Sequence, residues 1–284
     1  MNARSTFLAR ALLAVGATVV ALLVGEAAVR SSGVEPAEFM VRDRNLGQKY
    51  RPLLHIVLYD EESQRRVAVA INSIGFRDRE HDVASPPGMR RVVMLGDSFT
   101  AGLSVDFENT FPQICERLLD ESGPGGTWEV MTLAVAGDGT AQELLAYEQY
   151  GHADHPSVVV LNCFAGNDVS DNSPDLSTSL RPYFRLIDGR LVGSWPSESR
   201  RRVTTWLNDY SRLYTWQKRQ MQKVERFVKR DVVIDPVLRV FMSRSDEVMV
   251  RAWAVTESLI SSCARAWRLM AAACWCHTFR SGTE

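Results

Sequence analysis

RVVMLGDS, residues 91–98, is the stretch of sequence that decides the fold. Residues 91–95 have the length and the Val/Leu content of a buried strand, and Gly96-Asp97-Ser98 is a turn. The same order recurs twice, with Trp128–Leu133 before Gly137 and with Ser157–Cys163 before Gly166-Asn167-Asp168. Helical segments are expected between the strands, over 111–119 and 141–150. This alternation predicts an α/β fold, with a parallel sheet and helices on both faces.

The three turns are candidate site residues because parallel strands end at one edge of a sheet, where ligands bind. Ser98 stands at the start of a turn that leads from the first strand to a helix, a position that exposes a hydroxyl and suits a nucleophile. The amides of Ser98 and Gly137 and the side chain of Asn167 are expected to stabilise an oxyanion. The supporting residues are Gly96, Asp97, Gly166 and Asp168. Each motif alone is also typical of an ordinary turn.

Taken in this order, the motifs resemble those of the SGNH/GDSL hydrolase family. The matching segments are Gly96-Asp97-Ser98-Phe99-Thr100, the glycine block AVAGDGTAQEL around Gly137, and Gly166-Asn167-Asp168. Residues 72–78 resemble the segment before the first block in membrane-anchored bacterial members. The resemblance covers residues 70–180 and, loosely, 253–260. It implies a flavodoxin-like three-layer α/β/α fold and ester hydrolysis, with Ser98 attacking and Ser98, Gly137 and Asn167 forming the oxyanion hole. Thr132 departs from the family, which often has Asn there.

The general base is the missing part of the pattern. The family ends with Asp-x-x-His, whose His accepts the serine proton. The chain has His55, His81, His152, His155 and His277. The only Asp-x-x-His spacing, Asp78 to His81, precedes Ser98 and is interpreted as lead-in structure. His152 and His155 precede the third strand, and His277 has Cys274 where the Asp would stand. The general base is therefore unknown.

The C-terminal tail changes in composition after Ile260. Residues 261–284 hold three of the five cysteines and two of the seven tryptophans, and no Val/Ile-rich strand is expected there. We expect the reading frame to be disrupted near 260–262, so that the catalytic C-terminus is truncated by one strand–helix unit and its Asp-x-x-His. The alternative is a genuine divergent helix.

The N-terminus predicts an export segment. Arg4 and Arg10 precede Ala11–Gly25, fifteen residues without a charge. This run is short for a bilayer crossing but matches the apolar part of a signal sequence. We expect residues 1–30 to be an uncleaved signal anchor with a cytoplasmic N-terminus and an exported body, on the periplasmic or extracellular side. A cleaved signal peptide, giving a secreted protein, and a buried core helix are the alternatives.

Charge is distributed unevenly behind a formal total of −1. Residues 181–251 hold 16 Lys and Arg against 8 Asp and Glu, a net of +8. Apolar residues at near-helical intervals over 206–230 predict a basic helical insertion in this block. It either packs on the sheet domain with solvated cations, and could cover Ser98, or touches anionic lipid.

The predicted domains are 1–30, a lead-in over 31–88, and a hydrolase-like domain over 89–284.

These observations predict an exported serine esterase acting on acyl or acetyl esters of lipid or envelope carbohydrate. The alternatives are a catalytically impaired or non-catalytic binding relative and a polysaccharide O-acetyltransferase-like protein. Partners are a small-molecule or polysaccharide ester and the membrane, through the N-terminal helix. The export signal argues against nucleic acid. We expect no metal and no organic cofactor, and the cysteine spacing favours neither a disulfide framework nor a zinc site. The oligomeric state is not predicted.

Overall fold

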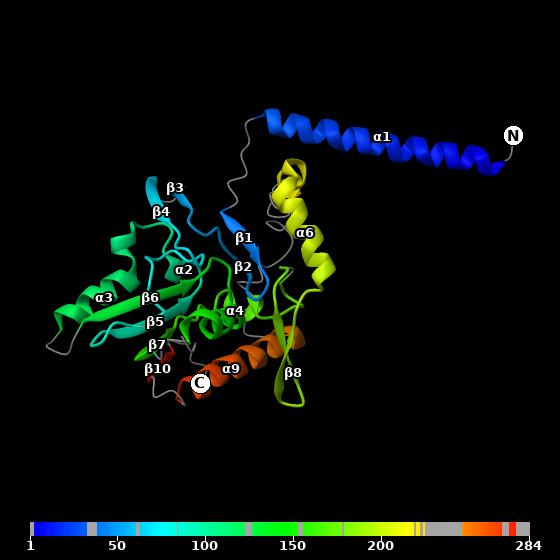
Figure 1. The fold of residues 1–284 in the computed structure, drawn as a ribbon. Coiled ribbons are helices and arrows are strands. Elements are labelled where there is room, and N and C mark those ends of the chain that lie inside the picture. The colour runs from blue at the N-terminus through cyan, green and yellow to red at the C-terminus, as the bar shows by residue number, and fades with distance from the viewer. Residues whose placement is uncertain are drawn as a thin grey trace. The chain divides into compact units, whose positions relative to one another are not determined.

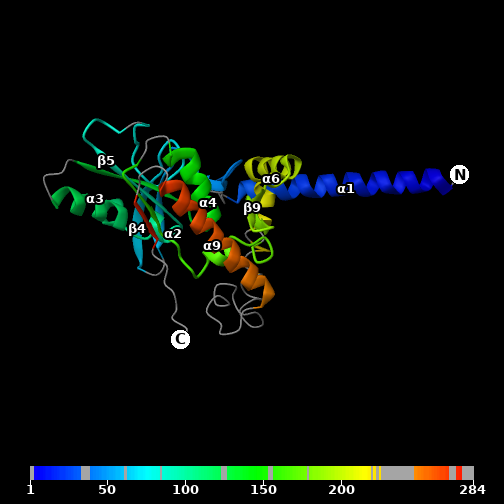
Figure 2. The same ribbon diagram turned by 90° about the horizontal axis from the view of Figure 1, so that it is seen from below.

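The chain forms two compact units in a computed structural model (Figures 1 and 2). The model describes residues 3–32, 39–60, 63–83, 85–122, 127–152, 156–177, 179–218, 220–221, 224, 246–268 and 273–276. One unit joins Met1–Glu38 to Ser197–Val233, and the other joins Phe39–Pro196 to Ile234–Glu284. We call them the N-terminal unit and the sheet unit.

The sheet unit is built on a four-stranded parallel sheet. Its strands are β5 (Arg90–Gly96), β6 (Trp128–Ala134), β7 (Val158–Leu161) and β10 (Ala273–Cys276), in the order β10-β7-β5-β6. The three strands expected from the sequence and their parallel pairing are confirmed. The sequence predicts no Val/Ile-rich strand after the late helix, and β10 is a strand without that content, with the sequence ACWC.

The two faces of the sheet enter different cores. Alternate strand residues, which include Val93, Leu133 and Leu161, belong to the larger core. That core also holds residues of α4 (Thr140–Ala146), of the π-helical turn Tyr147–Gly151 and of α9 (Glu247–Arg268). Intervening strand residues such as Val92 and Met94 meet Cys115 and Leu119 of α3 (Phe111–Glu121). The period of two along each strand therefore supplies two apolar faces.

The lead-in segment forms two antiparallel hairpins. They pair β1 (Met40–Asp43) with β2 (Gly47–Tyr50) and β3 (His55–Asp60) with β4 (Arg65–Ala70). Tyr50, Val67 and Phe76 are fully buried in the larger core. The sequence predicts a domain boundary at residue 88. In the structure, these lead-in residues share the larger core with the sheet.

The sequence predicts that the basic block 181–251 is a helical insertion, but its first part is a hairpin. It begins with a hairpin of β8 (Tyr183–Ile187) and β9 (Arg190–Ser194), followed by α6 (Glu198–Tyr210) and helical residues 212–218. Asp188 and Gly189 join the strands with φ of 51° and 72°. Two positive φ values are typical of the tight turn that Asp-Gly favours, and this signal could have predicted the hairpin. Residues 225–245 lie outside the described residues.

The N-terminal helix α1 (Ala3–Ser31) is long and apolar enough over Arg10–Ser31 to cross a membrane. Its described side chains are exposed along the apolar run. A signal sequence would have the same length and composition, so the helix is consistent with either a transmembrane anchor or a signal.

Candidate active site

Ser98 lies at the carboxyl end of the central strand β5. It is the first residue of the short helix α2 (Ser98–Ala101) and is exposed, as predicted for a nucleophile. Asp97 precedes it, and the Asp97 carboxylate accepts a hydrogen bond from the Phe99 N–H at 2.9 Å. A Cβ on Gly96 would collide with the Thr100 side chain. Gly96 is therefore required for the turn that presents Ser98.

Strand order places Ser98 where ligands bind in such sheets. The chain passes from β5 to β6 on one side and then returns to β7 on the other side of β5. Parallel α/β sheets bind ligands outside the carboxyl ends of the two strands at such a reversal. Ser98 follows β5, and Asn167 follows β7. The rings of Phe99 and Phe164, one from each turn, lie 4.7 Å apart between centroids.

Asn167 uses its side chain on neighbouring carboxylates. It precedes α5 (Asp168–Asp171), and its Nδ2 donates to Asp171 Oδ2 at 3.2 Å. Burial raises the pKa of Asp97, and the nearby Asn167 amide opposes this rise. The Asn167 amide is thus engaged with the acid Asp171 of its own turn. An oxyanion would compete with Asp171 for the Asn167 amide.

Gly137 is held by residues outside its own loop. Its φ is +78°, whereas a Cβ would meet only Gln48 Nε2, at 3.7 Å. The glycine is needed for this backbone conformation, not for close packing. Tyr50 Oη accepts from the Ala136 N–H at 2.9 Å, and Gln48 Nε2 donates to the Ala136 carbonyl at 3.1 Å. Arg181 Nη1 donates to the Gly137 carbonyl at 2.6 Å.

Arg181 connects the Gly137 turn to the turn after β7. Its guanidinium also lies 3.6 Å from Asp171 Oδ1, and Asp171 in turn accepts from Asn167. The relay from Gly137 through Arg181 and Asp171 to Asn167 links two of the three predicted motifs, the Gly137 turn and the Gly166-Asn167-Asp168 turn. Sequence reasoning missed Gln48, Tyr50 and Arg181 because each contacts the turn from more than 40 positions away.

Buried carboxyls lie under the strand ends. Asp97, Asp138 and Asp168 are 1%, 2% and 0% exposed. Burial raises the pKa of Asp138 and of Asp168 well above the ordinary range, and Arg181 opposes the shift at Asp138. Among described residues, Asp138 Oδ1 and Asp168 Oδ1 have no hydrogen-bond partner. Perturbed acids in one place are typical of functional sites. We call these three side chains the strand-end carboxyls.

Arg77 in the lead-in fixes the other end of α2. Its guanidinium donates to the carbonyls of Ala101 (3.1 Å), Gly102 and Val105 (2.7 Å). It is 2% exposed. The lead-in residues 72–78 therefore hold the helix that carries Ser98.

Among the described residues, no histidine hydrogen-bonds to Ser98. His81 is buried, with Nδ1 2.7 Å from Glu129 Oε1 and Nε2 2.9 Å from Asp78 Oδ2. Both ring nitrogens are thus engaged, in agreement with a lead-in role. His152 follows the turn Tyr147–Gly151 and precedes β7, at the amino end of the sheet. His155 and His277 lie outside the described residues.

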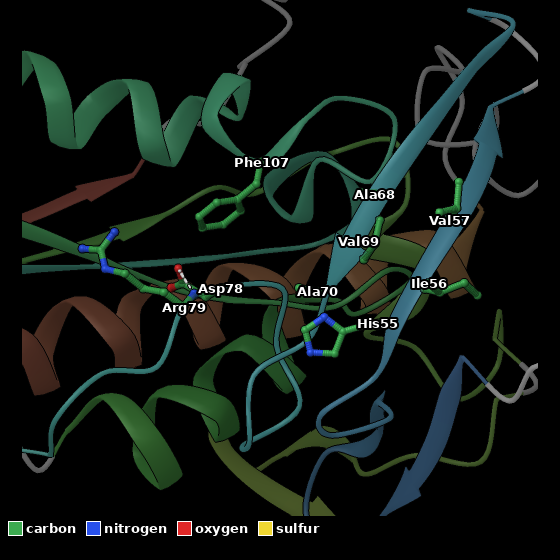
Figure 3. A pocket seen from close by; sticks show the side chains of 9 residues that line it. All are labelled: His55, Ile56, Val57, Ala68, Val69, Ala70, Asp78, Arg79 and Phe107. Atoms are coloured by element: carbon green, nitrogen blue, oxygen red, sulfur yellow. Dashed lines mark hydrogen bonds between the residues drawn. The ribbon is translucent and has the colours of Figure 1, made fainter.

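His55 borders a pocket of about 530 Å³ between the β3–β4 hairpin and Asp78–Arg79 (Figure 3). The other lining residues are Ile56, Val57, Ala68, Val69, Ala70 and Phe107. None of Ser98, Gly137 and Asn167 lines it. The pocket is therefore separate from the strand ends.

Comparison with known proteins gives limited likenesses. No family model matches the chain, and no curated protein matches it. A solved structure of TesA is 24% identical over 28% of this chain and 43% of its own, with a TM-score of 0.26. A variant of the esterase AlinE4 is 26% identical over 30% and 44%, with a TM-score of 0.26. AlinE4, an SGNH-hydrolase family esterase, is 18% identical over 67% and 77%, with a TM-score of 0.31. The chain thus spans less than half the length of the first two structures.

Proposed function

We propose that the chain is a membrane-tethered serine esterase with a three-layer α/β/α fold of the SGNH hydrolase type. The observation that carries this proposal is the exposed Ser98 between the ends of β5 and β7, with Gly137 and Asn167 linked at the same edge through Arg181 and Asp171. The substrate class is an ester with an acyl or acetyl group on lipid or envelope carbohydrate.

The proposed chemistry is acyl transfer through Ser98. The Ser98 Oγ attacks the ester carbonyl while its proton passes to a base, and the carbonyl oxygen becomes negative. The amides of Ser98 and Gly137 and the Asn167 side chain donate to that oxygen. The tetrahedral species then breaks its bond to the leaving oxygen, which takes the proton from the base and departs as the alcohol, leaving an acyl-serine that water hydrolyses to the free acid. Loss of one such donor typically costs about 3 kcal/mol of transition-state stabilisation.

His277 is the histidine to test as the general base for Ser98. β10 runs parallel to β7, with Cys276 opposite Leu161, so it ends at the same edge as β5. His277 is the next residue in the sequence. If it accepts the Ser98 proton, His277→Gln lowers turnover as strongly as Ser98→Ala does, because triad members act as one unit. His152→Gln is the matched control, since His152 is at the opposite end of the sheet.

Esterase turnover by the full chain in detergent is the decisive measurement. The substrates are p-nitrophenyl acetate, butyrate and octanoate, and a fluorophosphonate probe reports a reactive serine independently of turnover. Ser98→Ala is expected to abolish turnover and labelling. The control is Ser104→Ala, which removes an exposed hydroxyl from the loop after α2. A folded protein with neither turnover nor labelling would refute the esterase.

A second candidate is a non-catalytic relative that binds an acylated ligand at the same edge. It is favoured by one observation, the lack of a histidine bonded to Ser98 among the described residues. Saturable octanoate-ester binding without turnover, lost in Phe164→Ala, would support this candidate. Turnover that depends on Ser98 would exclude it.

A further inference from the structure

The N-terminal unit contains a contact between the candidate membrane span and the basic block. Glu26 of α1 lies just after the uncharged run Ala11–Gly25. Its carboxylate accepts from the backbone N–H groups of Arg212 (2.8 Å) and Leu213 (3.0 Å) and from Ser211 Oγ (2.9 Å). These are the free N–H groups at the start of a helix, which a carboxylate satisfies well. Glu26 therefore caps the helical residues 212–218.

Arg30 strengthens this contact. Its Nη2 donates to the Tyr210 carbonyl at 2.8 Å, and its Nε donates to Glu26 Oε1 at 2.8 Å. The chain at 210–213 is thus tied to both charged side chains near the carboxyl end of α1. Figures 1 and 2 show α6 beside that end of α1.

This contact fixes the depth of the basic block if α1 crosses a bilayer. Fifteen uncharged residues span about 22 Å of helix, less than the hydrocarbon thickness of about 30 Å. Glu26 and Arg30 are charged, so they lie at headgroup level. Residues 210–213, which bond to them, lie at the same level. Since α6 ends at Tyr210, this end of the helix also lies at the bilayer surface.

The exposed side chains of α6 suit that surface. Val203, Trp206 and Tyr210 are 58%, 58% and 65% exposed, and their spacing of three and four residues places them on one side of the helix. We call them the α6 stripe. The Trp206 and Tyr210 rings lie 6.1 Å apart between centroids. Trp and Tyr are the side chains that favour the membrane–water interface.

The charge of the block indicates which lipid the stripe meets. Residues 197–230 contain ten Lys and Arg against three Asp and Glu, a net of +7. Basic residues near a bilayer surface are attracted to anionic headgroups, each by about 1 kcal/mol. An aromatic stripe in a strongly basic segment is typical of helices that lie in the interface.

We propose that α6 lies on the bilayer beside the end of α1, with the α6 stripe among the headgroups of anionic lipid. The inference rests on the proposed tether by α1 and not on catalysis by Ser98. The helix then supplements a short membrane span with a second, interfacial attachment.

Fluorescence quenching of the reconstituted full chain tests the proposal. Vesicles contain phosphatidylcholine alone or a mixture with phosphatidylglycerol, and brominated acyl chains quench tryptophans at the bilayer. We expect Trp206→Phe to remove more of the quenchable emission than Trp128→Phe, its control on β6. Quenching should increase when phosphatidylglycerol is present and decrease at high salt. Unchanged quenching in Trp206→Phe would overturn the proposal, as would equal quenching in both lipids.

A second variant, Glu26→Ala, removes the cap without touching the stripe. It should lower Trp206 quenching while the chain still resists extraction by alkaline carbonate. In the wild-type chain, resistance to extraction with Trp206 unquenched would contradict the interfacial helix and leave the tether standing. Extraction of the wild-type chain would refute the tether and this proposal together, whereas esterase turnover would be unaffected. A soluble protein that protects the stripe would identify a protein partner in place of lipid and would also overturn the proposal.

Discussion

Two groups of buried polar side chains in the sheet unit differ in how their charges are compensated. In the first, His81 lies between Asp78 and Glu129, and Arg91 Nε donates to Glu129 Oε2 at 2.8 Å. We call these four residues the His81 network. In the second, the strand-end carboxyls include oxygens that have no partner among the described residues.

The pKa directions follow this difference. Burial alone would raise the pKa of Glu129, but hydrogen bonds from His81 and Arg91 outweigh it and lower the pKa. Burial alone would lower the pKa of His81, and its two carboxylates raise it. At Asp138 and Asp168 burial dominates. The His81 network therefore stabilises the fold. The edge beside Ser98 instead retains buried carboxyl oxygens without hydrogen-bond partners among the described residues, as is typical of functional sites.

Breaking the His81 network should have the largest effect on stability. Glu129→Ala leaves Arg91 and His81 buried without this carboxylate, and we expect the free energy of unfolding to fall by about 3–5 kcal/mol. Urea unfolding of the full chain measures it. Glu121→Ala, at the exposed end of α3, should change it by less than about 0.5 kcal/mol. A loss of turnover per folded molecule in Glu129→Ala, with stability unchanged, would remove the distinction between the two clusters.

Disconnecting the strand ends should act on turnover more than on stability. Arg181→Gln removes the hydrogen bond to the Gly137 carbonyl and the ion pair with Asp171, and misplaced donors cost on the order of 100-fold in kcat/KM. We expect kcat to fall more than KM rises, with partial recovery in Arg181→Lys. Arg185→Gln, exposed on β8, is the control. A change in KM alone would show that Arg181 binds substrate and does not position the Gly137 turn.

Neutralising a strand-end carboxyl should change the pH dependence of stability. Folded Asp138 retains its proton at pH values where the unfolded chain has lost it, so the free energy of unfolding falls as pH rises from 3.8 towards the raised pKa. Asp138→Asn should reduce this slope, by at most about 1.4 kcal/mol per pH unit. Glu129 should show the opposite dependence. Because its pKa is lowered, the stability that it contributes is present above its ordinary pKa and is lost as pH falls. Identical slopes for Asp138→Asn and wild type would contradict an uncompensated Asp138.

The smallest effect should come from the aromatic pair beside Ser98. Phe99 and Phe164 are 64% and 40% exposed, which leaves ring surface for an apolar acyl group. Phe164→Ala should cost about 0.5–1.5 kcal/mol, or roughly 2-fold to 12-fold in kcat/KM, for octanoate relative to acetate. Tyr59→Ala removes an exposed ring (55%) from β3 and should leave this ratio unchanged. An equal loss for both esters would mean that the pair positions Ser98.

The sequence predicts the central strands and the turns that follow them, because Val/Leu runs and Gly-Asp-Ser or Gly-Asn-Asp turns are local signals. It also predicts that the turn at Ser98 leads to a helix. The short β10 was missed, since four residues with two cysteines carry no strand signal. The hairpin over 183–194 was missed although Asp188-Gly189 marks it, because a block rich in Arg and Lys was interpreted as helix throughout.

The supports of the site could not be predicted from local patterns. Tyr50 reaches Ala136 and Arg181 reaches Gly137 across 86 and 44 positions. Such contacts depend on how the lead-in and the β8–β9 hairpin pack against the sheet. The pKa shifts at Asp138 and Asp168 likewise follow from burial, which no spacing of acids in the sequence shows.

The position of β10 has a consequence for how the protein is made. β10 pairs with β7, and 112 positions separate Leu161 from Ala273. During synthesis the outer edge of β7 therefore stays unpaired until residues 273–276 have left the ribosome. An open strand edge on an apolar sheet is a template for aggregation. A chaperone that covers this edge during translation should accordingly raise the yield of folded protein.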